Sequence, residues 1–122
     1  MPMIGFNATG YLTGQTLGLA GVYAVSANTS IPVQLWSHVS LTYSVSRGIR
    51  LFINGRLVSD NSTYSDYFAS GQMCTITLGT FLPSIPDAIV NGNIVLGQYS
   101  GKIDELKIFA RELTANEIIE LL

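Results

Sequence analysis

Charged side chains are scarce in this sequence, and most reactive residue types are scarcer still. Only 11% of the 122 residues are Asp, Glu, Lys or Arg, whereas a soluble domain typically carries about 25%. The chain has one cysteine and one histidine, and its net charge is −2. A single cysteine excludes an intrachain disulfide, and the shortage of both residues excludes most nucleophilic and metal-ligating constellations. The six scattered basic residues provide no cationic footprint for nucleic acid or anionic lipid.

Long apolar runs are also missing. No run approaches the roughly 18 residues of a membrane span, and the N-terminal MPMIGFNATG lacks the basic start and apolar core of a secretory signal. Hydrophobic residues nevertheless make up 48% of the chain, which is too many for a disordered segment. Because there is no internal repeat or linker, we expect one domain that covers residues 1–122.

Three glycosylation sequons are present, and they begin at Asn7, Asn28 and Asn61. Chance is the alternative explanation, because the chain is rich in Asn, Ser and Thr. All three sequons lie in polar stretches typical of loops or strand ends, which favours an extracellular or cell-surface location with these asparagines as acceptors. Since a secretory signal is missing, we interpret the chain as a piece of a longer secreted protein.

Short runs of β-branched and aromatic residues, separated by Gly, Ser, Asn and Pro, are typical of an all-β sandwich or barrel. The clearest strands are Trp36–Tyr43 and the run that starts at Gly48, which Asn54-Gly55 joins to a return strand by a tight hairpin turn. Further strands are expected at the ranges 4–6, 11–13, 22–25, 56–59, 73–79, 93–97 and 103–109.

The end of the chain changes from strand to helix periodicity. Thr114 and Glu117 have the spacing of a capping box, in which each side chain bonds the other residue's backbone N–H. Leu113 and Ile118 occupy the positions of a hydrophobic staple around that cap. The sequence therefore predicts a short C-terminal helix that covers one edge of the sheets.

Two long segments resemble one family. WSHVSLTY followed by GIRLFINGRLV is similar to the W-x-H-V…Y…G-x-R-L-F-x-N-G-x-L-V pattern of laminin-G-like jelly rolls, which belong to the concanavalin A-like lectin/glucanase superfamily. GKIDELKIFARELTANEI, near the end of the chain, is similar to the closing strand and helix of that family. The resemblance implies an antiparallel jelly-roll β-sandwich. The family's opening strands are not visible, so the chain corresponds to the C-terminal part of such a domain, with open sheet edges that could support self-association.

The same resemblance implies a metal site. In many relatives the aspartate of the I-D-E strand, here Asp104, helps to hold a structural calcium ion, although calcium needs six to eight oxygen ligands and the other ligands of relatives come from the opening strands. The alternative for Asp104 is an exposed strand carboxylate near Lys102.

Aromatic residues supply the remaining candidates. Tyr64, Asp66 and Tyr67 lie in the loop NSTYSDYFASG, which either forms a recognition surface or folds over the sheet and buries its rings. Trp36 could stack on a sugar, but its place at the start of a family-typical strand favours the core.

Two functions follow from these expectations. The first is a non-catalytic extracellular module that recognises a glycan or a protein partner, with calcium as a candidate cofactor. The second is a structural β-sandwich fragment that completes a larger adhesive or enzymatic protein. Catalysis is disfavoured because Asp104 and Glu105 are adjacent and would point to opposite faces of a strand, whereas a glycosidase needs a facing carboxylate pair.

Overall fold

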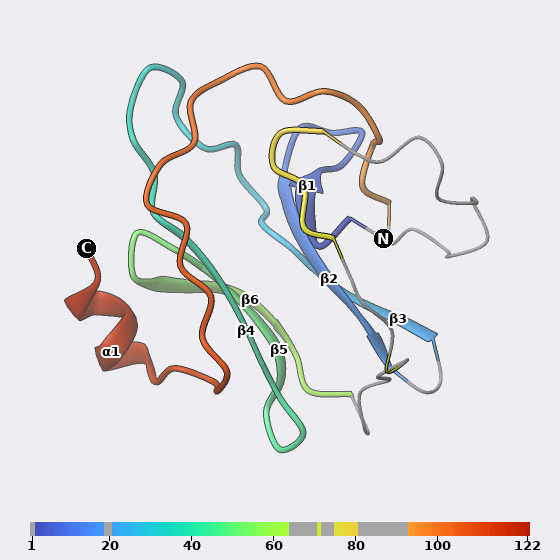
Figure 1. The fold of residues 1–122 in the computed structure, drawn as a ribbon, viewed down its shortest axis with the longest axis vertical. Helices are drawn as coiled ribbons and strands as arrows, with labels where there is room; N and C mark the ends of the chain where they lie inside the picture. The colour runs from blue at the N-terminus through green and yellow to red at the C-terminus, as the bar shows by residue number, and fades with distance from the viewer. Residues whose placement is uncertain (1, 19–20, 64–70, 72–74, 81–92) are drawn as a thin grey trace.

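The computed structural model describes residues 2–18, 21–63, 71, 75–80 and 93–122, and they form two small antiparallel sheets and one helix (Figure 1). The first sheet has the order β1-β2-β3, from strands β1 (Ile4–Phe6), β2 (Leu12–Gly18) and β3 (Gly21–Ser26). The second sheet has the order β4-β5-β6, from β4 (Val39–Ser44), β5 (Gly48–Ile53) and β6 (Arg56–Asn61). Helix α1 (Ala115–Glu120) follows near the C-terminus. The fold is therefore an incomplete β-sandwich, as the sequence predicted.

The core lies between the two sheets. Strand alternation places one apolar face of each sheet toward the other, and the buried residues of this cluster are Leu12, Val25, Ala27, Ile49 and Leu51. Gly14 belongs to the same contact, because a Cβ at this position would collide with the side chain of Leu41 on the opposite sheet. The sheets approach closely at that point because Gly14 has no side chain.

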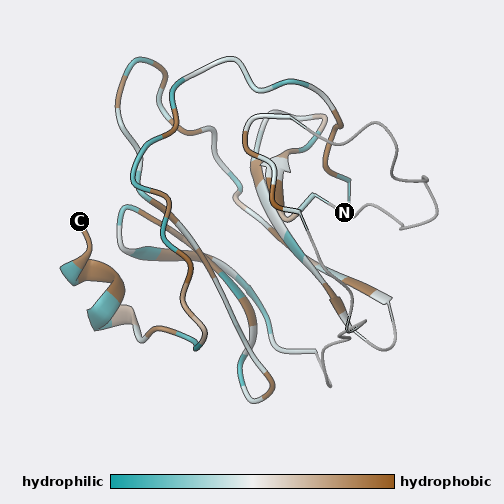
Figure 2. Cartoon of the chain, in the orientation of Figure 1, coloured by the Kyte–Doolittle hydropathy of each residue, from teal (hydrophilic) through white to brown (hydrophobic). Residues whose placement is uncertain are grey.

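A second, smaller cluster fixes the helix on the outer face of β5. Phe52 points away from the sandwich core and packs with Leu113 and Ile118, which are the two predicted staple residues. The capping box is confirmed: the Glu117 N–H donates to Thr114 Oγ1 at 3.2 Å, and the Thr114 N–H donates to Glu117 Oε2 at 2.8 Å. In Figure 2 the helix carries both apolar and polar residues, as an amphipathic element must.

The cap also makes the helix sensitive to acid. The Arg111 guanidinium donates two hydrogen bonds to the Glu117 carboxylate, at 2.8 and 3.0 Å, and together with the Thr114 N–H it lowers the pKa of Glu117 from 4.5 to about 2. A depressed pKa stabilises the folded state above the unfolded pKa, and this contribution disappears as the pH falls through the folded value. We expect the stability difference between wild type and Glu117→Gln to shrink between pH 4.5 and about 2.

Chemical denaturation at a series of pH values measures this difference. Glu120→Gln is the matched control, because Glu120 lies on the same helix and forms no ion pair in the described part of the chain. A wild-type advantage over Glu117→Gln that stays constant from pH 5 to pH 2 would contradict the assignment.

The hairpin prediction is confirmed, and its turn explains where β4 begins. Asn54 and Gly55 have φ values of 50° and 76°, the left-handed pair of a tight hairpin turn. The last ladder pair is Val39 with Ile53. Beyond it the Asn54 side chain replaces a backbone partner: the His38 N–H donates to Asn54 Oδ1 at 2.9 Å, and the Asn54 N–H donates to the His38 carbonyl at 2.8 Å. Because β5 turns away here, β4 begins at Val39, and the predicted start at Trp36 is wrong.

Strand β6 is an edge strand with an irregularity. Leu57 pairs with Phe52 and Ser59 pairs with Leu51, so Val58 is an extra residue that forms a β-bulge. The strand runs to Asn61, two residues beyond the predicted end at Ser59.

Three strands predicted in the second half of the chain are wrong, because the described residues of these ranges form no strand. The range 75–79 has no strand assignment, and residues 73 and 74 lie outside the described residues. In the range 93–97 only Ile94 forms an isolated bridge, to Asn7. The range 103–109 has no ladder, and Glu105 interrupts it with a φ of 55°. A strand requires backbone pairing with a neighbour, and these segments form no ladder with any described strand.

Candidate functional site: a hollow beside Trp36

Trp36 lies on the surface, so its predicted place in the core is wrong. Its side chain is 67% exposed, because the residue precedes β4 and no strand lies opposite it. Two segments far apart in sequence meet beside it and form a shallow hollow of about 230 Å³. The lining residues are Trp36, Ser37, His38, Asp104 and Glu105. An aromatic face, a hydroxyl, an imidazole and two carboxylates are thus brought together.

Ser37 contributes a polar group with no partner. Its Oγ is buried, yet it forms no hydrogen bond within the described part of the chain. A buried polar group without a hydrogen bond costs about 1–3 kcal/mol, and such groups are rare in folded proteins. Because Ser37 lines the hollow, this unsatisfied oxygen lies beneath its surface. The sequence contained no signal for this feature, because Ser37 is one of many serines in the chain.

The two carboxylates differ in their surroundings. Asp104 Oδ1 accepts the backbone N–H of Glu105 at 2.8 Å, and Asp104 forms no ion pair with any residue that the structure describes. Glu105 Oε2 lies 3.3 Å from Lys107 Nζ. Asp104 is therefore the free negative charge of the hollow. Glu105 also lines the hollow and has a left-handed φ of 55°, and its residue type gives no sequence signal for either feature.

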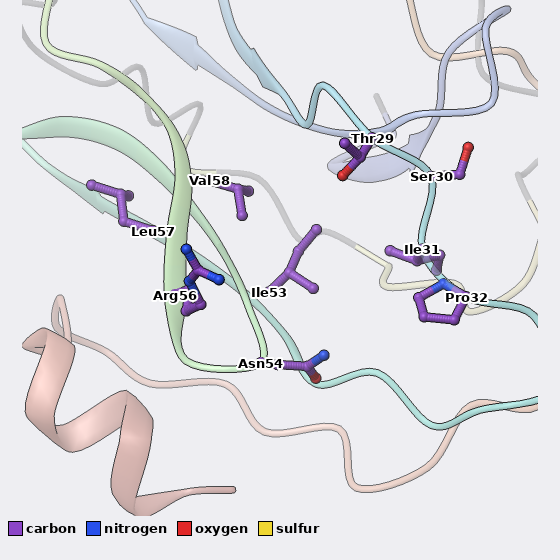
Figure 3. Close-up of a pocket in the computed structure, with 9 residues that line it drawn as sticks. All are labelled: Thr29, Ser30, Ile31, Pro32, Ile53, Asn54, Arg56, Leu57 and Val58. Atoms are coloured by element: carbon purple, nitrogen blue, oxygen red, sulfur yellow. The ribbon is translucent and has the colours of Figure 1, made fainter.

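A second hollow, of about 270 Å³, lies between the segment Thr29–Pro32 and the β5–β6 hairpin (Figure 3). Its walls combine the aliphatic side chains of Ile31, Ile53 and Val58 with the guanidinium of Arg56. No aromatic ring or carboxylate lines it. Sugars are commonly recognised by an aromatic ring face together with carboxylates that form hydrogen bonds. Of the two hollows, only the Trp36 hollow combines these groups.

The other predicted site residues are distributed as follows. Tyr64, Asp66 and Tyr67 lie outside the described residues, so that recognition surface stays a prediction. Of the three expected glycosylation sites only Asn28 is exposed. Asn7 Oδ1 accepts the backbone N–H groups of Thr9 and Tyr11, each at 3.0 Å. Asn61 Oδ1 accepts the Thr63 N–H at 3.0 Å. Glycosylation at all three stays a prediction.

A calcium site at Asp104 also stays a prediction. The described residues include no group of three or more His, Cys, Asp or Glu side chains that could hold a metal ion. An ion at Asp104 would need backbone, water or ligand oxygens for the rest of its six to eight ligands. Within the same residues no helix has the length and apolar character needed to cross a bilayer.

An incomplete antiparallel β-sandwich with shallow surface hollows is the architecture of a recognition or structural module. The laminin-G-like family profile, described as the concanavalin A-like lectin/glucanases superfamily, matches residues 3–119, and the chain belongs to this superfamily. The resemblance seen in the sequence is thus confirmed.

A solved structure supports the same fold. The chain is similar to a crystal structure of residues 221–444 of an S-layer domain-containing protein from Clostridium thermocellum, with 27% identity and a TM-score of 0.58. The match covers 92% of this chain and 51% of that chain, so this chain spans about half of its structural relative. No curated protein sequence matches it.

Proposed function

We propose that the chain is a non-catalytic recognition module of an extracellular or cell-surface protein, and that it binds a glycan in the Trp36 hollow. The observation that carries this proposal is the exposed indole of Trp36 beside the Asp104 carboxylate in one hollow. A sugar ring presents an apolar face for stacking and hydroxyls for hydrogen bonds, so it complements each of these groups. The superfamily and the S-layer relative are compatible with a role outside the cell.

Trp36→Ala is expected to lower glycan affinity by tenfold to 100-fold. Burial of a large apolar side chain contributes about 1.5–3 kcal/mol, and each 1.4 kcal/mol is about tenfold in Kd. Isothermal titration with a panel of oligosaccharides measures the loss. Because Trp36 is the single tryptophan of the chain, its fluorescence also reports binding directly in the wild type.

Val33→Ala is the matched control, because Val33 is 85% exposed, lies three residues before Trp36 and does not line the hollow. Equal affinity in Trp36→Ala and wild type would place the site elsewhere, and the loop of Tyr64 and Tyr67 would be tested next. Repeating the titration with calcium and with a chelator tests the proposed cofactor.

A second candidate function is structural: the chain completes a larger β-sandwich with strands from elsewhere. Large apolar side chains are exposed in the range 103–109, which forms no ladder in the structure. Ile103, Leu106 and Ile108 are 50%, 56% and 68% exposed. Contiguous exposed apolar side chains mark surfaces that another chain covers. Sedimentation velocity over a concentration series tests completion by a second copy of the chain. A glycan titration of the chain alone tests completion by strands from elsewhere, because saturable binding without those strands contradicts a purely structural role.

A further inference from the structure

The charge of the Trp36 hollow limits which glycans fit it. No lysine or arginine lines the hollow, whereas Asp104 and Glu105 both do. Lys107 pairs with Glu105, and among the described residues neither Lys107 nor Lys102 forms an ion pair with Asp104. The negative charge of Asp104 is therefore available to a ligand. An anionic glycan, sulfated or rich in uronic acids, would meet this carboxylate without a compensating cation.

The indole of Trp36 also favours a positively charged ligand. The face of an aromatic ring carries negative potential, and tryptophan attracts a nearby cation more strongly than the other aromatic side chains do. An ammonium group in the hollow would thus interact favourably with the Trp36 ring and with the free Asp104 carboxylate.

We infer that the preferred ligand of the hollow is a saccharide with free amino groups, of the deacetylated glucosamine type. The inference rests on the proposed glycan-binding function and adds the chemical class of the sugar. A protonated amine on the ring lets one sugar unit stack on Trp36 and form a charge-assisted hydrogen bond to Asp104. Acetylation removes the positive charge, and with it the cation–π attraction and the ionic attraction to Asp104, and leaves an amide N–H that can donate only a weaker hydrogen bond.

Three tetrasaccharides with the same β-1,4 backbone test this inference, since they differ only at carbon 2 of each ring: glucose, N-acetylglucosamine and glucosamine oligomers. Trp36 fluorescence is measured on the wild-type chain during titration with each. We expect the glucosamine oligomer to bind about tenfold more tightly than the acetylated one, which corresponds to about 1.4 kcal/mol. Added salt should reduce this preference, because the hollow is open to solvent and its charges are screened.

Asp104→Asn removes the charge and keeps an oxygen that can accept the Glu105 N–H. This variant is expected to lose most of the preference for the amino sugar, measured as the ratio of its Kd values for the glucose and glucosamine oligomers, because only the ammonium group depends on the negative charge. Asp60→Asn is the matched control, because it removes one negative charge from β6, outside the hollow, and should leave the preference unchanged. Circular dichroism of both variants verifies that they remain folded.

The outcomes separate the inference from the function on which it rests. Equal or tighter binding of the neutral oligomers, with a clear Trp36 response, overturns the inference and keeps the glycan-binding function. Binding that requires calcium overturns the inference too, because a cation at Asp104 would repel an ammonium group. A preference that survives Asp104→Asn also overturns it. If no oligosaccharide changes the Trp36 fluorescence or releases heat, both proposals fail.

Discussion

Phe52→Ala is expected to lower the free energy of unfolding by about 3–5 kcal/mol, the usual cost of removing a buried phenylalanine. The Phe52 side chain is 1% exposed and packs from β5 against Leu113 and Ile118. Arg50 also lies over the ring, with its guanidinium carbon 5.3 Å from the centroid. A domain of this size has about 5–15 kcal/mol of stability in total, so the variant should be largely unfolded at moderate urea.

Urea denaturation monitored by circular dichroism measures the effect. Leu57→Ala is the matched control, because Leu57 pairs with Phe52 on the neighbouring strand but is 43% exposed. A loss below about 1 kcal/mol for Phe52→Ala is what an exposed position would show. That result would mean that the helix does not pack on β5.

Gly48→Ala is expected to have an effect of similar size for a different reason. Gly48 starts β5 with a φ of 70°, and a Cβ there would collide with the backbone carbonyl oxygen of Asn61 on β6. Backbone cannot move aside as a flexible side chain does, so the alanine must break the β5–β6 ladder at this end. Gly10 has a φ of 84° and open space around its Cβ position, which makes Gly10→Ala the control for left-handed strain alone.

The two alanine variants are compared by their midpoints of thermal unfolding. Gly10→Ala should cost only the roughly 1–2 kcal/mol of a left-handed non-glycine residue, and Gly48→Ala clearly more. Equal midpoints would show that β6 does not lie against Gly48 in solution.

The elements that the sequence predicted correctly are those whose signals are local. The Asn54-Gly55 turn and the Thr114 capping box each need only neighbouring residues, and both formed as expected. The range 103–109 has an equally good strand pattern, but a strand depends on a partner far away in sequence. Local pattern alone could not reveal that the described residues provide no partner.

In the candidate site, too, the sequence predicted some features correctly and others wrongly. The family pattern singles out Asp104, whereas the place of Trp36 at the start of a family-typical strand predicts a core position that the structure does not show. The available signal was the position of the hairpin turn. Ile53 pairs with Val39, so a residue three positions earlier lies beyond the sheet. Counting back from Asn54-Gly55 would have placed Trp36 on the surface.

The extra residue at Val58 makes the two edges of the second sheet, β4 and β6, different from each other. A further strand added beside β6 would have to follow a bulged, locally twisted neighbour, and bulges at edges disfavour such pairing. Strand β4 pairs with β5 without any register shift, so its outer side is the regular one. Extension of this sheet, whether by another part of the same protein or by a second molecule, is therefore directional: the regular edge of β4 favours it and the bulged edge of β6 disfavours it.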